Sequence, residues 1–137
     1  MDFLTHGSLP FALYADLDLL ALRIVLAAIF VMHGIQKAGA WKNAGMPMRS
    51  VMKVLSVAEP LGALALAVGF LTPIAASALS LIMLGAIWMK VRRWHVPFTT
   101  HQGTGWEFDL LILAALCVLS SSGAGSMSVD ALLSVAR

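Results

Sequence analysis

Four long apolar runs, each bounded by polar or turn-forming residues, divide the chain. They cover approximately residues 19–37, 51–70, 74–91 and 105–121. An α-helix rises about 1.5 Å per residue and a bilayer core is about 30 Å thick, so about 20 apolar residues can cross it. The pattern therefore predicts an all-α membrane protein, formed as a four-transmembrane-helix bundle.

Composition supports this prediction and excludes several other classes. Of the 137 residues, 60% are hydrophobic and 12% are charged, and the mean hydropathy is +0.89. A soluble domain carries about 25% charged residues, so this composition excludes disorder and argues against a water-soluble globule. The net charge of +2 is small and the basic residues sit in two loops, which leaves nucleic-acid binding without support. The lone Cys117 excludes an internal disulfide, and the expected partner of the chain is the lipid bilayer.

The apolar runs also set the expected boundaries. Residues 1–18 are expected to form an interfacial N-terminal segment, interrupted by Pro10, and residues 19–122 the four-helix membrane domain. Residues 123–137 are expected to form a short C-terminal tail, in which Ser128 caps a short amphipathic helix after a flexible break.

The loops predict an orientation. The stretch 69–73 is a tight hairpin without charge, whereas the loops 37–53 and 90–105 hold seven of the nine basic residues. Four alternating spans place these two loops on the same side of the membrane. The positive-inside rule makes that side cytoplasmic, with both termini outside.

A few ionisable residues interrupt the apolar runs, and each needs a partner or a purpose because a charge near the bilayer centre costs at least about 2.5 kcal/mol. His33, Gln36 and Lys37 share one face of the first run, and Glu59 lies inside the second beside Pro60. In the expected topology these groups meet the start of the fourth helix. One polar cluster is expected there, with these members: His33, Gln36, Lys37, Glu59, Glu107 and Asp109.

Simpler explanations stay open for each of these residues. Lys37 can extend to the headgroups, Glu107 and Asp109 can cap the fourth helix, and Glu59 can serve only in an ion pair. Trp106 is a candidate for ligand contact, although an aromatic belt at the interface also explains it. Structural roles are expected for Arg23, which can either extend outward to the headgroups or bond terminal carbonyls of another helix. Structural roles are also expected for three glycines at close helix contacts: Gly34, Gly62 and Gly69. The histidine spacing fits no metal motif, so no metal site is expected.

The order of these features resembles the DoxX family of small four-span bacterial membrane proteins. The matching features are Arg23, then FVMHGIQK at 30–37, EPLGA at 59–63, GFLTP at 69–73, and Glu107. The resemblance covers about residues 19–120, and the second glycine of the family's "ExxGG" pattern is absent here. It implies a multi-pass protein of the bacterial inner membrane. It also suggests a membrane subunit linked to quinone oxidoreduction, because the family is named after a subunit of a thiosulfate:quinone oxidoreductase.

Three functions fit these observations. The first is a quinone-interacting redox subunit, in which Glu59 and Glu107 carry protons and His33, Gln36, Lys37 and Trp106 contact the ligand. The chain has no recognisable flavin, haem or iron–sulfur motif, so electrons would come from a redox partner protein. The second is a non-catalytic membrane scaffold or assembly partner that works through its basic loops. The third is a small-molecule transporter, for which four spans suffice only in a homo-oligomer. Whether the chain is an enzyme, and whether a quinone is its cofactor, stay open at this point.

Overall fold

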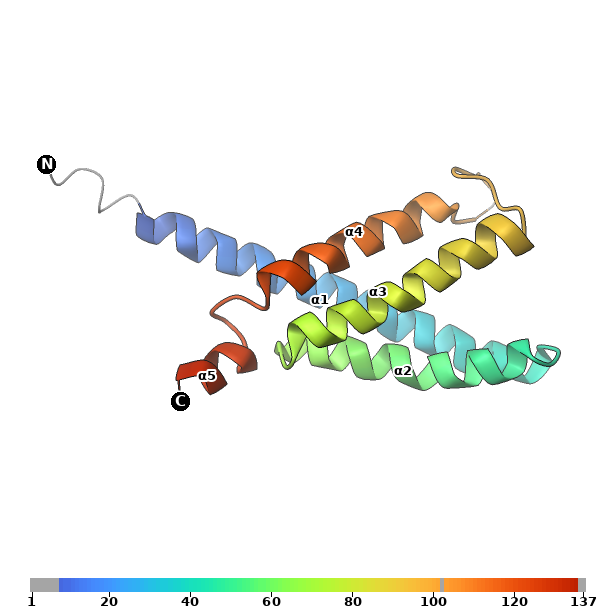
Figure 1. Cartoon of the computed structure of the whole chain (residues 1–137), viewed down its shortest axis with the longest axis horizontal. Coiled ribbons are helices and arrows are strands. Elements are labelled where there is room, and N and C mark those ends of the chain that lie inside the picture. The colour runs from blue at the N-terminus through green and yellow to red at the C-terminus, as the bar shows by residue number, and fades with distance from the viewer. Residues whose placement is uncertain (1–7, 102, 136–137) are drawn as a thin grey trace, which may run out of the picture.

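The computed structural model describes residues 8–101 and 103–135, and within these ranges the chain is all-helical, as predicted (Figure 1). The helices are α1 (Ser8–Ala40), α2 (Met48–Val68), α3 (Thr72–Trp88), α4 (Trp106–Ser122) and α5 (Val129–Val135). A 3₁₀ turn (Trp41–Asn43) follows α1, and a π-helical turn (Met89–Arg93) extends α3.

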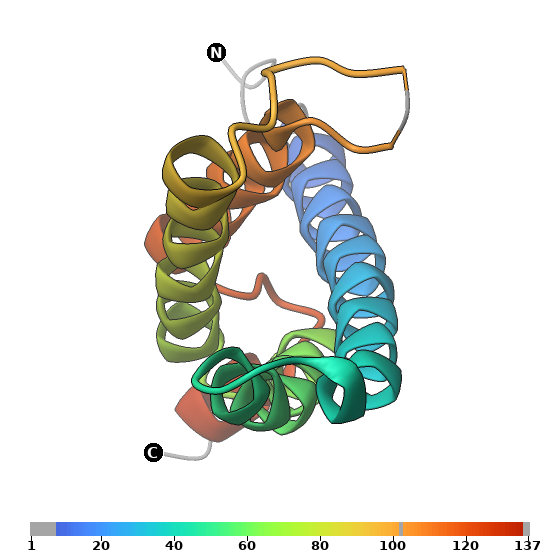
Figure 2. The same ribbon diagram turned by 90° about the vertical axis from the view of Figure 1, so that its right-hand side faces the viewer.

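Seen end-on, the four long helices surround a common centre (Figure 2), and α1 crosses α3 and α4 at an angle (Figure 1). The connections α1–α2 and α3–α4 lie at one end, which we call the loop end. The α2–α3 hairpin and α5 lie toward the opposite end, which we call the hairpin end. The basic loops therefore share one end of the molecule, as the alternation of apolar runs predicts.

Two of the described helices are long and apolar enough to cross a membrane. They are α2 and the helix formed by α3 with its π-helical extension to Arg93. Only 17% of each apolar window is buried inside the protein, so most of these apolar side chains face outward, as lipid-facing helices do. Spanning by α1 and by the 17-residue α4 stays a prediction.

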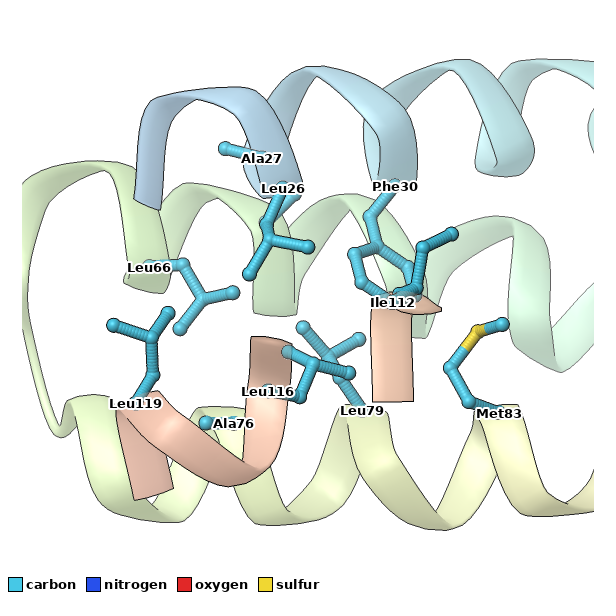
Figure 3. Close-up of a cluster of buried hydrophobic side chains, with 11 residues drawn as sticks. Leu26, Ala27, Phe30, Leu66, Ala76, Leu79, Met83, Ile112, Leu116 and Leu119 are labelled. Atoms are coloured by element: carbon cyan, nitrogen blue, oxygen red, sulfur yellow. The ribbon is translucent and has the colours of Figure 1, made fainter. Parts of the chain in front are cut away.

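The core lies where the four long helices face one another (Figure 3). It is built from aliphatic side chains, one phenylalanine and one methionine, with α1 contributing Leu26 and Phe30, α2 Leu66, and α3 Leu79. Ile112, Leu116 and Leu119 complete it from α4. Their spacing of four and three residues puts them on one helix face, which explains how a short helix closes the core.

The start of α1 differs from the expected separate segment. Residues 8–18 are continuous with the rest of α1, and Pro10 lies in the first turn, where a missing N–H breaks no helical hydrogen bond. Residues 1–7 lie outside the described part of the chain.

Gly34 and Gly62 allow close helix contacts. A Cβ added at Gly34 would lie 2.3 Å from Cγ of Pro60, and one at Gly62 would lie 2.9 Å from Cδ2 of Leu79. Gly34 therefore brings α1 onto α2 at the proline, and Gly62 brings α2 onto α3. Helix α2 continues through Pro60, so this proline serves as a packing surface.

The hairpin and Arg23 meet at the hairpin end. Gly69 ends α2 with a φ of 69°, a left-handed conformation that favours glycine, and a Cβ there would lie 2.2 Å from Nη1 of Arg23. The Arg23 side chain is almost fully buried and donates to the carbonyl oxygens of Ala124 (2.9 Å) and Met127 (2.6 Å). Arg23 thus bonds carbonyls just beyond α4, as expected, and it holds a stretch that the sequence suggested to be a flexible break.

The C-terminal helix is fastened to the same place. Ser128 accepts a hydrogen bond from the N–H of Ala131 at 3.1 Å, which confirms it as the cap of α5. The Asp130 carboxylate accepts hydrogen bonds from the N–H groups of Leu71 (2.7 Å) and Thr72 (2.9 Å), so it caps α3 from a distant part of the chain. Burial acts to raise the pKa of Asp130, but these N–H donors and the Arg23 charge outweigh it and hold the pKa below 3.8.

We predict that Gly34→Ala destabilises the protein, because the methyl group would overlap the Pro60 ring. Overpacking of this kind costs about 1–3 kcal/mol. Gly39→Ala is the matched control: it lies on the same helix, and a Cβ there meets nothing within 4 Å. Thermal unfolding in detergent should show a lower Tm for Gly34→Ala alone, and equal Tm values for the two variants would contradict the contact.

We also predict that the Asp130 cap weakens in acid. Because its pKa is lower in the folded than in the unfolded protein, its contribution is fully present well above pH 4 and is lost as the pH falls through the folded value. At pH 7, Asp130→Asn should lose about 1 kcal/mol, because hydrogen bonds to a charged acceptor are stronger than those to a neutral one. The difference in Tm between wild type and variant should shrink below pH 4, and a constant difference from pH 7 to pH 3 would argue against the cap.

Candidate functional site

Lys37 and Glu59 form an ion pair between α1 and α2, toward the loop end. The Lys37 Nζ lies 2.6 Å from both carboxylate oxygens of Glu59. The Glu59 side chain is 1% exposed and that of Lys37 28% exposed. The charge pairing expected from the sequence is therefore present, and the lysine remains the more accessible partner.

A second ion pair joins Lys90 to Asp109 at 2.7 Å. Asp109 is buried in the first turn of α4, and Lys90 lies in the π-helical turn that extends α3. The sequence suggested Asp109 as a member of the polar cluster but placed Lys90 in the cytoplasmic loop. A π-helical turn changes the direction of its side chains relative to an α-helix. The sequence pattern did not predict that turn, and so did not predict the position of Lys90.

Both ion pairs line one cavity of about 580 Å³ at the loop end. His33 and Gln36 line it as well, so five of the six expected cluster residues line this cavity, and Lys90 joins them. The His33 ring lies edge-on to Phe30, with ring centroids 6.1 Å apart. The polar lining residues are His33, Gln36, Lys37, Glu59, Lys90, Thr104 and Asp109.

The rest of the lining is mainly apolar and comes from α2, α3 and the turn after α3. It includes four methionines: Met48, Met52, Met83 and Met89. Methionine side chains are flexible and polarisable, and they adapt to ligands of irregular shape. The cavity therefore presents two neutralised charge pairs in an adaptable apolar wall.

Glu107 and Trp106 are not among the residues that line this cavity. The Glu107 carboxylate accepts a hydrogen bond from the Thr99 hydroxyl at 2.5 Å, and its N–H donates to the carbonyl of Phe98 at 3.2 Å. Trp106 packs edge-on against Phe98, with centroids 4.5 Å apart. Both residues hold the α3–α4 loop against the start of α4. Their position at the start of the fourth predicted helix is what suggested a site role.

The two histidines of the α3–α4 loop and Gly85 of α3 were not part of the expected cluster. His95 and His101 are exposed in the α3–α4 loop. Among the described residues, no group of three His, Cys, Asp or Glu side chains is placed to hold a metal ion. Gly85 lines the cavity, and a Cβ there would meet nothing within 4 Å.

Comparison with known proteins identifies a family. The model of the DoxX family matches residues 19–92, which is more than half of the chain and extends from α1 to the π-helical turn. The match confirms the resemblance inferred from the residues, and it includes Lys37, Glu59 and Lys90 but not Asp109 or Glu107. No curated protein and no solved structure matches the chain.

We predict that Lys37 and Glu59 are energetically coupled. Removing one partner leaves an uncompensated charge in an apolar protein interior, so Lys37→Met and Glu59→Gln should each lower the free energy of unfolding. The loss in the double variant should be smaller than the sum of the two single losses. We expect a coupling energy of about 1–3 kcal/mol from a double-mutant cycle of unfolding free energies. The pair Lys53→Met and Glu59→Gln is the control, because Lys53 is exposed on α2. Additive losses for Lys37 and Glu59 would count against the ion pair.

Proposed function

The chain belongs to the DoxX family, and we propose that it is a quinone-interacting subunit of a membrane redox system. The family and the apolar helices assign the chain to a membrane. The observation that carries the proposal is the convergence of two ion pairs on one largely apolar cavity. Charged groups within an apolar bundle mark functional sites more often than structural ones.

The lining residues fit the chemistry of a quinone. Such a ligand needs an apolar slot for its ring and donors for its carbonyl oxygens, and the lysine ammonium groups and His33 can donate. When bound, a quinone accepts two electrons and two protons. Glu59 and Asp109 can hold and deliver protons beside it, and in this role Asp109 replaces Glu107, which does not line the cavity.

The same proposal includes the arrangement in the membrane. All four long helices span the bilayer, the loop end is cytoplasmic and both termini lie outside, in the inner membrane of a bacterium. Support comes from the seven basic residues at the loop end. Electrons come from a redox partner protein, and a homo-oligomer is the expected assembly.

A scaffold function is the second candidate, and one observation favours it. Arg92 and Arg93 are exposed beside each other at the loop end, in the last residues of the π-helical turn. Basic groups close to the membrane surface attract anionic lipids and acidic protein surfaces, by about 1 kcal/mol for each charge. This function needs no occupied cavity, and ligand binding therefore separates the two candidates.

The test is quinone binding by the purified protein in nanodiscs, with Glu59→Gln compared with Glu107→Gln. The amide of Glu59→Gln is nearly isosteric with the carboxylate and should keep the helices packed, although Lys37 loses its counter-charge. We expect its quinone affinity to fall at least about tenfold, which corresponds to about 1.4 kcal/mol, the scale of one hydrogen bond to a charged group. The affinity of Glu107→Gln should change less than about twofold.

Thermal stability measured on the same preparations separates binding from folding. A Glu59→Gln protein that is less stable but binds quinone as tightly as wild type would remove Glu59 from the site. A wild-type protein that binds no quinone, together with loss of acidic-partner binding in Arg92→Gln/Arg93→Gln, would favour the scaffold.

A further inference from the structure

The cavity has a polar side and an apolar side. Its polar groups come mainly from α1, the α3–α4 connection and α4, and they include His33, Gln36 and Asp109. Apart from Glu59, every residue that α2 and α3 contribute is nonpolar. A ligand with a polar head and an apolar tail would therefore direct its tail toward α2 and α3.

Helices α2 and α3 separate on that side. They pack tightly near the hairpin, where a Cβ on Gly62 would overlap Leu79. Toward the loop end the two helices draw apart in both views (Figures 1 and 2). The cavity lies in this part, because its lining residues on α2 run from Met48 to Glu59 and those on α3 from Leu81 to Trp88.

Several residues lie where α2 and α3 draw apart, and these residues both line the cavity and are exposed. Val51 on α2 is 49% exposed, and Leu81 and Trp88 on α3 are 70% and 59% exposed. Gly85, one turn from both Leu81 and Trp88, is also exposed and has open space at the position of a Cβ. An exposed apolar margin on a membrane helix faces hydrocarbon, so the cavity opens sideways into the lipid.

The volume sets a further constraint. About 580 Å³ lies within the range of about 300–1,000 Å³ that holds drug-sized ligands. A ring head and the first part of a chain fit, but a long polyprenyl tail does not. The rest of such a tail has to leave the protein through the opening.

We infer that the ligand enters the cavity from the hydrocarbon phase through the gap between the loop-end halves of α2 and α3, and that its tail stays in that gap past Gly85. The ligand class is a membrane-resident molecule with an uncharged polar head and a long apolar tail. The uncharged head follows from the charge balance, because each lysine is already neutralised by a carboxylate. The identification of the head as a quinone rests on the proposed function; the route through the lipid does not.

The first experiment tests the route without any ligand. In a Cys117→Ser background, a nitroxide is attached to Gly85→Cys, and its collisions with oxygen and with a water-soluble nickel chelate are compared in proteoliposomes. Leu111→Cys, on the exposed face of α4, gives the lipid reference, and Arg92→Cys at the loop end gives the water reference. We expect Gly85→Cys to favour oxygen as Leu111→Cys does. A nickel-dominated signal like that of Arg92→Cys would overturn lateral access, whether or not the protein binds quinone.

The second experiment fills the gap. Gly85→Phe places a ring in the open space, and Gly39→Phe is the matched control on α1, outside the cavity. In proteoliposomes, Gly85→Phe should weaken binding of a long-tailed quinone at least about tenfold, and should change binding of a tail-less, water-soluble quinone less than about threefold. Gly39→Phe should change neither.

The outcomes distinguish this inference from the proposed function. Equal losses for the two quinones, or wild-type binding of the long-tailed quinone by Gly85→Phe, would show that the tail does not pass Gly85 and would overturn the inference. A wild-type protein that binds neither quinone would overturn the proposed function, and the nitroxide measurement would still decide the route.

Discussion

The cost of an ionised side chain in hydrocarbon governs this structure. Arg23, Glu59 and Asp109 are almost fully buried in a helical protein whose outer surface carries many exposed apolar side chains. An unpartnered charge at such depth costs several kcal/mol, so each of them is found with a partner from a different segment of the chain. Arg23 is bonded to carbonyls beyond α4, Glu59 to Lys37, and Asp109 to Lys90. The first contact joins the two ends of the described chain, and the other two each join a helix to the next one along the chain.

The two ends of the molecule use this constraint differently. At the hairpin end, the Arg23 charge is bonded to backbone carbonyls, and the adjoining space is filled by Gly69, Ser128 and the start of α5. At the loop end, the paired charges border a cavity, and a neutral ligand can meet donors and acceptors without an added charge. The hairpin end therefore suits structural closure, and the loop end suits recognition.

The sequence predicts much of this architecture. The four apolar runs correspond to α1–α4, and Lys37 and Glu59 are paired as the cost of burial requires. Gly69 and Thr72 lie at the expected hairpin, since a left-handed glycine ends α2 there. These features depend on local periodicity, or on a single charge that needs a partner, and both can be recognised in one sequence.

Other features depend on geometry that the sequence does not encode locally. Lys90 reaches Asp109 through a π-helical turn, and Asp130 caps a helix 58 residues earlier in the chain. Glu107 resembled Asp109 in type and position, yet only Asp109 lies on the helix face that meets the cavity. Two residues of offset on a helix change the direction of a side chain by more than half a turn, and the loop contacts of Glu107 follow from that difference.

The central claim is that the paired charges at the loop end hold the polar head of a membrane-resident molecule. The most direct measurement is native mass spectrometry of the chain released from mild detergent, combined with extraction and identification of any molecule that stays bound. We expect a quinone on the wild-type protein and its loss from a protein carrying both Lys37→Met and Glu59→Met, in which the ion pair is replaced without leaving a charge. A wild-type chain free of any quinone, or equal retention by the two proteins, would contradict the account.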